Sequence, residues 1–289
     1  MPPIYTAADL LQLTAEQKSI LVYGPPGGGK TWSLVTLIKY LIRMKLGPLV
    51  VFDLDLKIES LVYIANKLGL LHHLIVIRPL GNSADIIMAN AGRAGMNKEP
   101  FLAFQKDINV FCNGMDPQTG KFRANFNYGH LLEGIEPKPA APGAIFIDGL
   151  TKFQDIALEF ILGTLGHELN AKGTNSQDDY GRQMGKIMEA IQTVKTIPCI
   201  TGWTAHEQQL QDQVGALTIL PLVTGKKLPH ALAKEFNCTL YSTSIRASAG
   251  EMPKHVWQVM PDGKVQIAGR TGWEPPSVYV DQDYDKLFG

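Results

Sequence analysis

The fold is decided by the stretch Gly24-Pro25-Pro26-Gly27-Gly28-Gly29-Lys30-Thr31, which fits the pattern G-x-x-x-x-G-K-[ST]. Residues 19–23 before it form a short apolar run typical of a buried strand. After it, apolar residues recur at helical spacing over 34–42, and Gly47-Pro48 ends that run. A strand, a glycine loop and a helix in this order predict a phosphate-binding loop, because the glycine N–H groups and the helix N-terminus both favour anions.

The residues of this loop have distinct expected roles. Lys30 is expected to reach the β- and γ-phosphates of a nucleotide, and Thr31 to ligate Mg²⁺. The alternative interpretation is a glycine-rich turn that precedes a helix by chance, which the correct flanks disfavour. We therefore expect the nucleotide to contact Gly24, Pro25, Pro26, Gly27, Gly28, Gly29, Lys30, Thr31 and Trp32.

The bulk composition excludes several classes of protein. Of the 289 residues, 45% are hydrophobic and 19% are charged, which is ordinary for a globular protein. The formal net charge is zero, so no overall basic field indicates nucleic-acid binding, and any such surface must be local. Three widely spaced cysteines without a C-x-x-C pair favour free thiols in a reducing compartment over a disulfide frame or a zinc site.

The sequence also lacks signals of export and membrane insertion. The start, Met1-Pro2-Pro3-Ile4-Tyr5, shows no basic region followed by an apolar core, so we expect no signal peptide. No apolar run approaches the ~20 residues of a membrane span. These patterns predict a cytoplasmic protein with no membrane partner.

Further apolar runs alternate with helical patterns along the chain. Strands are expected at 48–55, 74–79, 144–149 and 198–204, and helices at 59–68, 82–93, 100–112, 151–167 and 180–194. Continuous apolar strands suit a parallel sheet covered on both faces. The pattern predicts one α/β domain over 1–289, a doubly wound parallel sheet with its core at 19–235.

Three segments depart from this alternation. Residues 113–143 are rich in Gly, Pro and Asn and predict an inserted loop. Residues 207–229 predict a mobile loop. Residues 254–260 and 265–268 flank Pro261-Asp262-Gly263-Lys264, which predicts a small antiparallel β-hairpin within a C-terminal extension over 236–289.

Asp148 is the expected second metal-binding acid, because it ends an apolar strand far downstream of Lys30. A Walker-B acid at such a place holds Mg²⁺ through water. The alternative is a helix N-cap acid. Many AAA enzymes carry a glutamate directly after this acid, but here that position is Gly149, so the catalytic base must come from elsewhere.

Asp55 is the preferred catalytic base. Asp53 and Asp55 end the strand after the loop's helix, where RecA-like ATPases keep theirs. Aspartate is one methylene shorter than the usual glutamate, and the alternative is a plain strand-end acid. Glu59 is a further candidate.

His206 is the expected sensor of the γ-phosphate. It lies in Thr204-Ala205-His206-Glu207, which closes the strand expected at 198–204. A polar group there can face the phosphate and respond to hydrolysis. The alternative is a structural histidine.

With these motifs, the chain resembles a family of phage-encoded P-loop ATPases with a RecA-like core, of the AAA type. Some members act with single-strand-annealing recombination systems. The resemblance covers roughly residues 19–275 and rests on the glycine loop, on Phe146-Ile147-Asp148 and on 204–207. Shorter similar pieces are Asp179-Tyr180-Gly181, Leu222-Val223-Thr224-Gly225-Lys226-Lys227 and Arg270-Thr271-Gly272.

The resemblance implies ATP/ADP and Mg²⁺ binding, ring or filament assembly, and single-stranded DNA in the central channel. It also implies a single-strand-binding or annealing protein as a partner, and the host-cell cytoplasm as the location. A neighbouring subunit would supply a cation to the nucleotide, for which Arg270 is the first candidate and Arg246 the second. Ala268 and Gly269 stand where a second basic residue often occurs, so a paired finger is not expected.

Two function classes follow. The first is an oligomeric DNA-dependent ATPase of phage recombination or replication, with DNA bound by loops 168–178 and 207–229. The second is a nucleotide-dependent assembly or packaging NTPase that acts on protein partners, which the missing glutamate and neutral charge favour. The loops offer Asn170, Lys172, Asn175, Gln177, Gln208, Gln209, Gln211, Lys226 and Lys227, which could equally form solvated polar loops.

Overall fold

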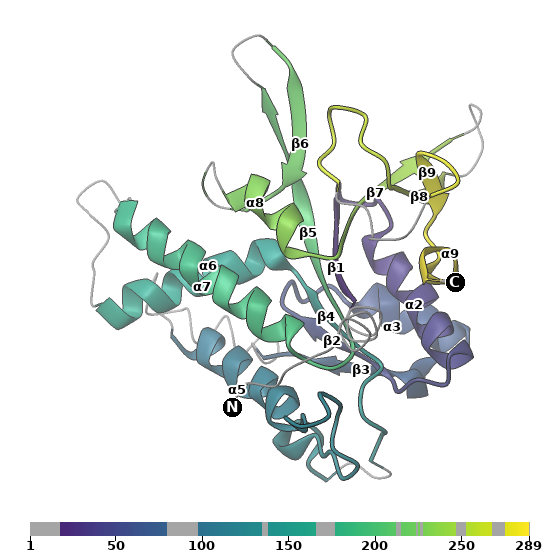
Figure 1. The fold of residues 1–289 in the computed structure, drawn as a ribbon, viewed down its shortest axis with the longest axis vertical. Coiled ribbons are helices and arrows are strands. Elements are labelled where there is room, and N and C mark those ends of the chain that lie inside the picture. The colour runs from purple at the N-terminus through teal and green to yellow at the C-terminus, as the bar shows by residue number, and fades with distance from the viewer. Residues whose placement is uncertain are drawn as a thin grey trace.

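The chain folds into a mixed α/β structure around a mostly parallel sheet (Figure 1). The computed structural model describes residues 18–79, 98–134, 138–165, 177–211, 215–223, 225, 228–246, 253–267 and 275–288. Within these residues, the strand order is β3-β2-β4-β5-β1-β7-β8-β9, and β6 pairs with β5.

Six strands of this sheet are parallel, and the remaining strands extend it in antiparallel fashion. The parallel strands are β1 (Ser19–Gly24), β2 (Leu49–Asp53), β3 (Leu74–Ile77), β4 (Ala144–Asp148), β5 (Ile200–Gln211) and β7 (Cys238–Ile245). The others are β6 (Leu217–Pro221), β8 (Lys254–Gln258) and β9 (Tyr279–Asp281).

Helices cover both faces of the sheet because its strands are apolar on both sides. In β1, Ile20 and Val22 join one buried cluster, whereas Leu21 and Tyr23 join the other. The first cluster contains α2 (Lys30–Arg43), α3 (Glu59–Lys67) and α9 (Tyr284–Phe288). The second contains α5 (Glu99–Asn113), α6 (Leu150–Leu165), α7 (Gln177–Lys195) and α8 (Leu228–Glu235).

Most elements expected from the sequence are confirmed. The expected strands and the helices at 59–68, 100–112, 151–167 and 180–194 all occur, with ends shifted by a few residues. The helix expected at 82–93 lies outside the described residues. The described residues of 113–143 are largely irregular as expected, apart from a short 3₁₀ helix at Gly129–Leu132, and the Phe126 and Tyr128 rings pack on Phe111 of α5.

The prediction of a loop at 207–229 is wrong over much of its length. β5 continues to Gln211 and forms an antiparallel hairpin with β6, which projects from the sheet (Figure 1). Residues 228–229 begin α8. The end of β5 is rich in glutamine, so its sequence does not indicate a strand. Its partner, Leu217–Pro221, contains apolar and β-branched residues.

The hairpin expected between 254–260 and 265–268 is also wrong. β8 pairs with β7 and β9 instead. Asp262 forms the expected turn, since its carboxylate accepts the N–H groups of Lys264 and Val265. The turn leads the chain to β6, where Ile219 exchanges backbone hydrogen bonds with Lys264 and Gln266. The antiparallel extension therefore consists of β8 and β9, and β7 belongs to the central sheet beside β1.

Candidate functional site

The glycine-rich loop connects the carboxyl end of β1 to the first turn of α2. Gly27 and Gly29 have φ angles of 75° and 93°, which glycine adopts without strain. The Gly28 N–H donates to the Pro25 carbonyl at 3.1 Å, and the Ser33 N–H donates to Gly29 at 2.9 Å as the helix begins. The loop thus turns tightly onto the helix N-terminus, as the sequence pattern predicted.

Close packing against β7 explains the glycines at other positions of the loop. A Cβ atom on Gly24 would lie 2.1 Å from the Ser242 carbonyl oxygen, and one on Gly28 would lie 2.6 Å from the same atom. Real side chains do not tolerate such distances to backbone atoms. These glycines therefore let the loop approach the neighbouring strand.

Lys30 curls over the loop that precedes it. Its Nζ donates to the carbonyl oxygens of Gly24 and Pro25 at 2.8 and 2.9 Å. Burial lowers the pKa of Lys30, and three nearby carboxylates raise it, those of Asp148, Glu207 and Asp55. The ammonium is thus held between the loop and a group of acids. Thr31 is half-buried in the next position, and Trp32 is 39% exposed.

Asp148, the expected metal acid, is buried at the carboxyl end of β4. Strand register aligns it with Asp53 of β2 on one side and Thr204 of β5 on the other. The Thr204 hydroxyl donates to the Asp148 carboxylate and accepts the Gly149 N–H at 3.0 Å. Burial raises the pKa of Asp148 to about 6; the neighbouring acids Asp55 and Asp53 add to the rise, while Thr204 and Lys30 oppose it.

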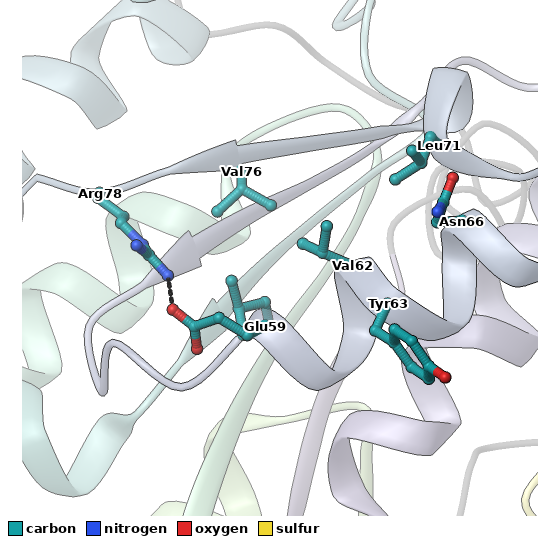
Figure 2. A pocket seen from close by; sticks show the side chains of 8 residues that line it. Glu59, Val62, Tyr63, Asn66, Leu71, Val76 and Arg78 are labelled. Carbon is teal, nitrogen blue, oxygen red and sulfur yellow. Dashed lines mark hydrogen bonds and ion pairs between the residues drawn. The ribbon is translucent and has the colours of Figure 1, made fainter.

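Asp53 and Glu59, the other acids named from the sequence, are both bound by Arg78. The Arg78 Nε donates to the fully buried Asp53 at 2.9 Å, and the Lys57 N–H donates to the same carboxylate at 3.1 Å. Another guanidinium nitrogen donates to Glu59 at 2.5 Å (Figure 2). Glu59 and Arg78 border a groove of about 660 Å³ between α3 and β3. Asp53 is therefore a structural ion-pair partner.

Asp55 has a different environment from Asp53. Its carboxylate lies 3.7 Å from the His206 Nε2 and is 21% exposed. Gly149 has a φ of 112°, and a Cβ atom there would lie 2.9 Å from Asp55 Oδ1. The Asp55 carboxylate therefore fills the space beside Gly149, where the sequence lacks the glutamate of many AAA enzymes.

His206 connects these acids to the hairpin formed by β5 and β6. It lies opposite Gly24 in the strand register. The backbone N–H of His206 donates to the Thr151 hydroxyl at 3.2 Å, and the backbone carbonyl of His206 accepts a hydrogen bond from the Leu222 N–H at 2.7 Å. The Thr151 hydroxyl in turn donates to the Leu222 carbonyl at 3.2 Å. These hydrogen bonds join His206 and Thr151 to the base of the hairpin.

The remaining candidates are dispersed. Arg246 is exposed just after β7, and Arg270 lies outside the described residues, as do Asn170, Lys172, Asn175, Lys226 and Lys227. Gln208, Gln209 and Gln211 lie on β5 in the hairpin. Sequence reasoning quoted Thr204 without a role, and it overlooked Ser242 and Gln282, which contact the glycine loop.

The described residues contain no cluster of three or more His, Cys, Asp or Glu side chains arranged to hold a metal ion. In the same part of the chain, no helix combines the length and apolar character needed to cross a membrane. Neither the models of known protein families nor the curated proteins include a match to this sequence.

Proposed function

We propose that this chain is a Mg²⁺-dependent ATP-binding protein and ATP hydrolase with a P-loop and a RecA-like core. The observation that carries the proposal is that Lys30, Asp148 and Asp55 lie within electrostatic reach of one another at the carboxyl-end edge of the sheet, beyond β1, β4 and β2, with β5 between β4 and β1. In open α/β sheets, ligands bind at this edge. A phosphate loop beside a cation and two acids is suited to a nucleotide with its metal.

The residues present fit ATP and Mg²⁺. The Lys30 ammonium is partly buried, and the hydrogen bonds that it donates among the described residues go to two carbonyl oxygens, so exchanging these for phosphate oxygens would be favourable. Thr31 and Asp148 would hold Mg²⁺, the latter through water, with the remaining ligands from phosphate and solvent. Such a site requires no three-residue protein cluster. The metal would neutralise phosphate charge when bound.

Asp55 is proposed as the group that orients or deprotonates the attacking water. Its carboxylate is partly exposed, lies against Gly149 and faces His206 rather than an arginine. A carboxylate in this position can accept a proton from water. His206 would then respond to the charge at Asp55 and pass the change to the hairpin through Thr151 and Leu222.

Coupling to single-stranded DNA in phage recombination or replication is proposed from the family resemblance and the projecting hairpin. Gln209 and Gln211 lie on one face of β5 in that hairpin and offer amides to a nucleic acid. An assembly or packaging NTPase is the second candidate, favoured by a specific observation. Leu210 and Leu217 are 39% and 37% exposed on the same hairpin, which suits a protein partner.

The experiment that separates these functions is ATP turnover with and without single-stranded DNA. We expect DNA to raise turnover several-fold, and we expect the stimulation to be lost in Gln209→Ala/Gln211→Ala. Leu210→Ser is the matched control, because it changes the opposite face of the strand. ATP turnover that DNA does not raise would favour the protein-partner function, and absence of ATP turnover under all conditions would refute the hydrolase.

A further inference from the structure

The carbonyl oxygen of Gly28 accepts hydrogen bonds from two side chains that are distant in sequence. The Ser242 hydroxyl of β7 donates to it at 2.9 Å. The Gln282 Nε2, just after β9, also donates to it at 2.9 Å. Both side chains are buried. The Gly28 carbonyl therefore points toward β7 and toward the residue that follows β9.

The orientation of the Gln282 amide is fixed by its partners. Its nitrogen lies 2.9 Å from the Gly28 carbonyl oxygen and 3.1 Å from the Val256 carbonyl oxygen, both of which only accept hydrogen bonds. The nitrogen is also 2.7 Å from the Ser242 hydroxyl. The Gln282 Oε1 is buried and has no hydrogen-bond partner among the described residues. The side chain therefore acts here as a donor.

Because the Gly28–Gly29 peptide is planar, the hydrogen bonds to the Gly28 carbonyl also determine the direction of the Gly29 N–H. In a planar trans peptide, the carbonyl of Gly28 and the N–H of Gly29 point in opposite directions. Because the carbonyl points toward Ser242 and Gln282, the Gly29 N–H points away from them. Gly28 and Gly29 have little intrinsic backbone preference, so the two donors select one orientation among several accessible ones.

The segment that carries Gln282 is itself anchored to α2. Asp285 accepts a hydrogen bond from Arg43 at 2.9 Å, and the Phe288 ring packs 5.4 Å from the ring of Tyr40. Trp257 of β8 packs against Tyr284 at 4.9 Å. The short helix α9 thus fixes Gln282 relative to the helix that the glycine loop precedes.

We propose that Gln282, together with Ser242, is a positioning residue that orients the Gly28–Gly29 peptide so that its N–H binds a nucleotide phosphate. The inference rests on the proposed function, since it assigns the phosphate as the ligand of that N–H. The C-terminal strands β8 and β9 and helix α9 would thereby support the nucleotide site through the glycine loop.

The test uses Gln282→Met, which keeps the length of the side chain and removes its donors. We expect the Kd for ATP to rise about tenfold, the size of one lost hydrogen bond to a buried group. We expect kcat at saturating ATP to change less than twofold, because Lys30, Asp55 and Asp148 are untouched. Ser242→Ala is expected to act in the same direction, and the double variant is expected to be less than additive, because both residues hold one carbonyl.

Phe126→Ala is the matched control, since it removes a half-buried ring that packs on Phe111 and Tyr128 and takes no part in holding the glycine loop or Gln282. Amide hydrogen exchange of Gly29 in the protein without nucleotide supplies a readout independent of turnover, and we expect it to change in Gln282→Met only. An unaltered Kd in Gln282→Met, or an equal rise in Phe126→Ala at equal loss of Tm, would overturn the inference. A parent chain that does not bind ATP would instead refute the proposed function.

Discussion

Two acidic clusters at the end of β2 differ in how their charge is compensated. Asp53 is fully buried and accepts hydrogen bonds from Arg78 and from the Lys57 N–H. Asp55, two residues later, is partly exposed. Its carboxylate fills the space beside Gly149 and lies 3.7 Å from the His206 Nε2. An acid with a permanent cationic partner is suited to holding the fold, whereas an acid facing a titratable histidine and a lysine remains available for chemistry.

The largest expected effect concerns Lys30, the lysine near Asp55 and Asp148. Lys30→Ala is expected to abolish tight ATP binding, with a rise in Kd of 100-fold or more, roughly the value of a charge-assisted contact to phosphate. Arg78→Met is the matched control, because it removes the cation that binds Asp53, and it should retain ATP affinity. Isothermal titration of both variants checks this, and unchanged affinity in Lys30→Ala would refute the assignment of the loop.

The next prediction separates the two aspartates directly. Asp55→Asn is expected to lower kcat by about 10²-fold with nucleotide affinity kept, the usual size for loss of a general base. Asp53→Asn is expected to lower the free energy of unfolding by about 2 kcal/mol, because Arg78 loses its buried partner but is itself partly exposed. Steady-state kinetics and urea unfolding measure the two. A stable Asp55→Asn with full kcat would move the role to another residue.

Asp148 should link stability to pH with an unusual sign. Because its pKa is raised to about 6 from an ordinary value of 3.8, the folded protein binds the proton more tightly than the unfolded chain does. Its contribution to stability is therefore present below pH 4 and is lost as the pH rises through 6. Urea unfolding at pH 4 to 7 should show that Asp148→Asn removes this loss, about 2–3 kcal/mol at most.

The same variant should show the opposite effect on activity. Asp148→Asn is expected to weaken Mg²⁺-dependent turnover, because a neutral amide is a poorer partner for metal-bound water. A Mg²⁺ titration of the ATPase rate measures this. The metal role would be untenable if the variant matched the parent at every Mg²⁺ concentration.

The smallest expected effect is at His206. His206→Ala should reduce the difference in protease cleavage of the hairpin tip between ATP-analogue and ADP states, since it removes the side chain that faces Asp55. Ser244→Ala serves as a control, because its hydroxyl lies beside Gly27 of the glycine loop and His255, and it makes no hydrogen bond to the described residues of the hairpin. A difference that persists in His206→Ala would make His206 a structural residue.

The sequence predicted those parts of the site that are local or that end apolar strands. The glycine loop, Lys30, Asp148 and Asp55 were named because a short motif or a strand end marked each of them. The pairing of Arg78 with Asp53 was not foreseen, because a contact over 25 residues depends on which strands become neighbours. For the same reason the role of Thr204 was missed, since β5 had to lie beside β4 before its hydroxyl could meet Asp148.

The elements that were predicted wrongly are those whose pattern depends on a distant partner. The end of β5 is polar, so nothing in 207–211 alone indicates a strand. Its pairing with the partly apolar Leu217–Pro221 gives it that structure. The turn at Asp262 was predicted correctly, but its destination was not, because a D-G turn fixes local geometry and leaves the choice of partner strand open.

The contact between Gln282 and Gly28 spans 254 residues and has a consequence for the order in which the protein is made. At synthesis rates of roughly 5–20 residues per second, the glycine loop leaves the ribosome some 10–50 seconds before Gln282 is added. β1 must also wait for β5 and β7, which pair with it from far downstream. The glycine loop therefore reaches its final form only after Gln282 has been added, and under the proposed function a shorter nascent chain is expected not to retain nucleotide.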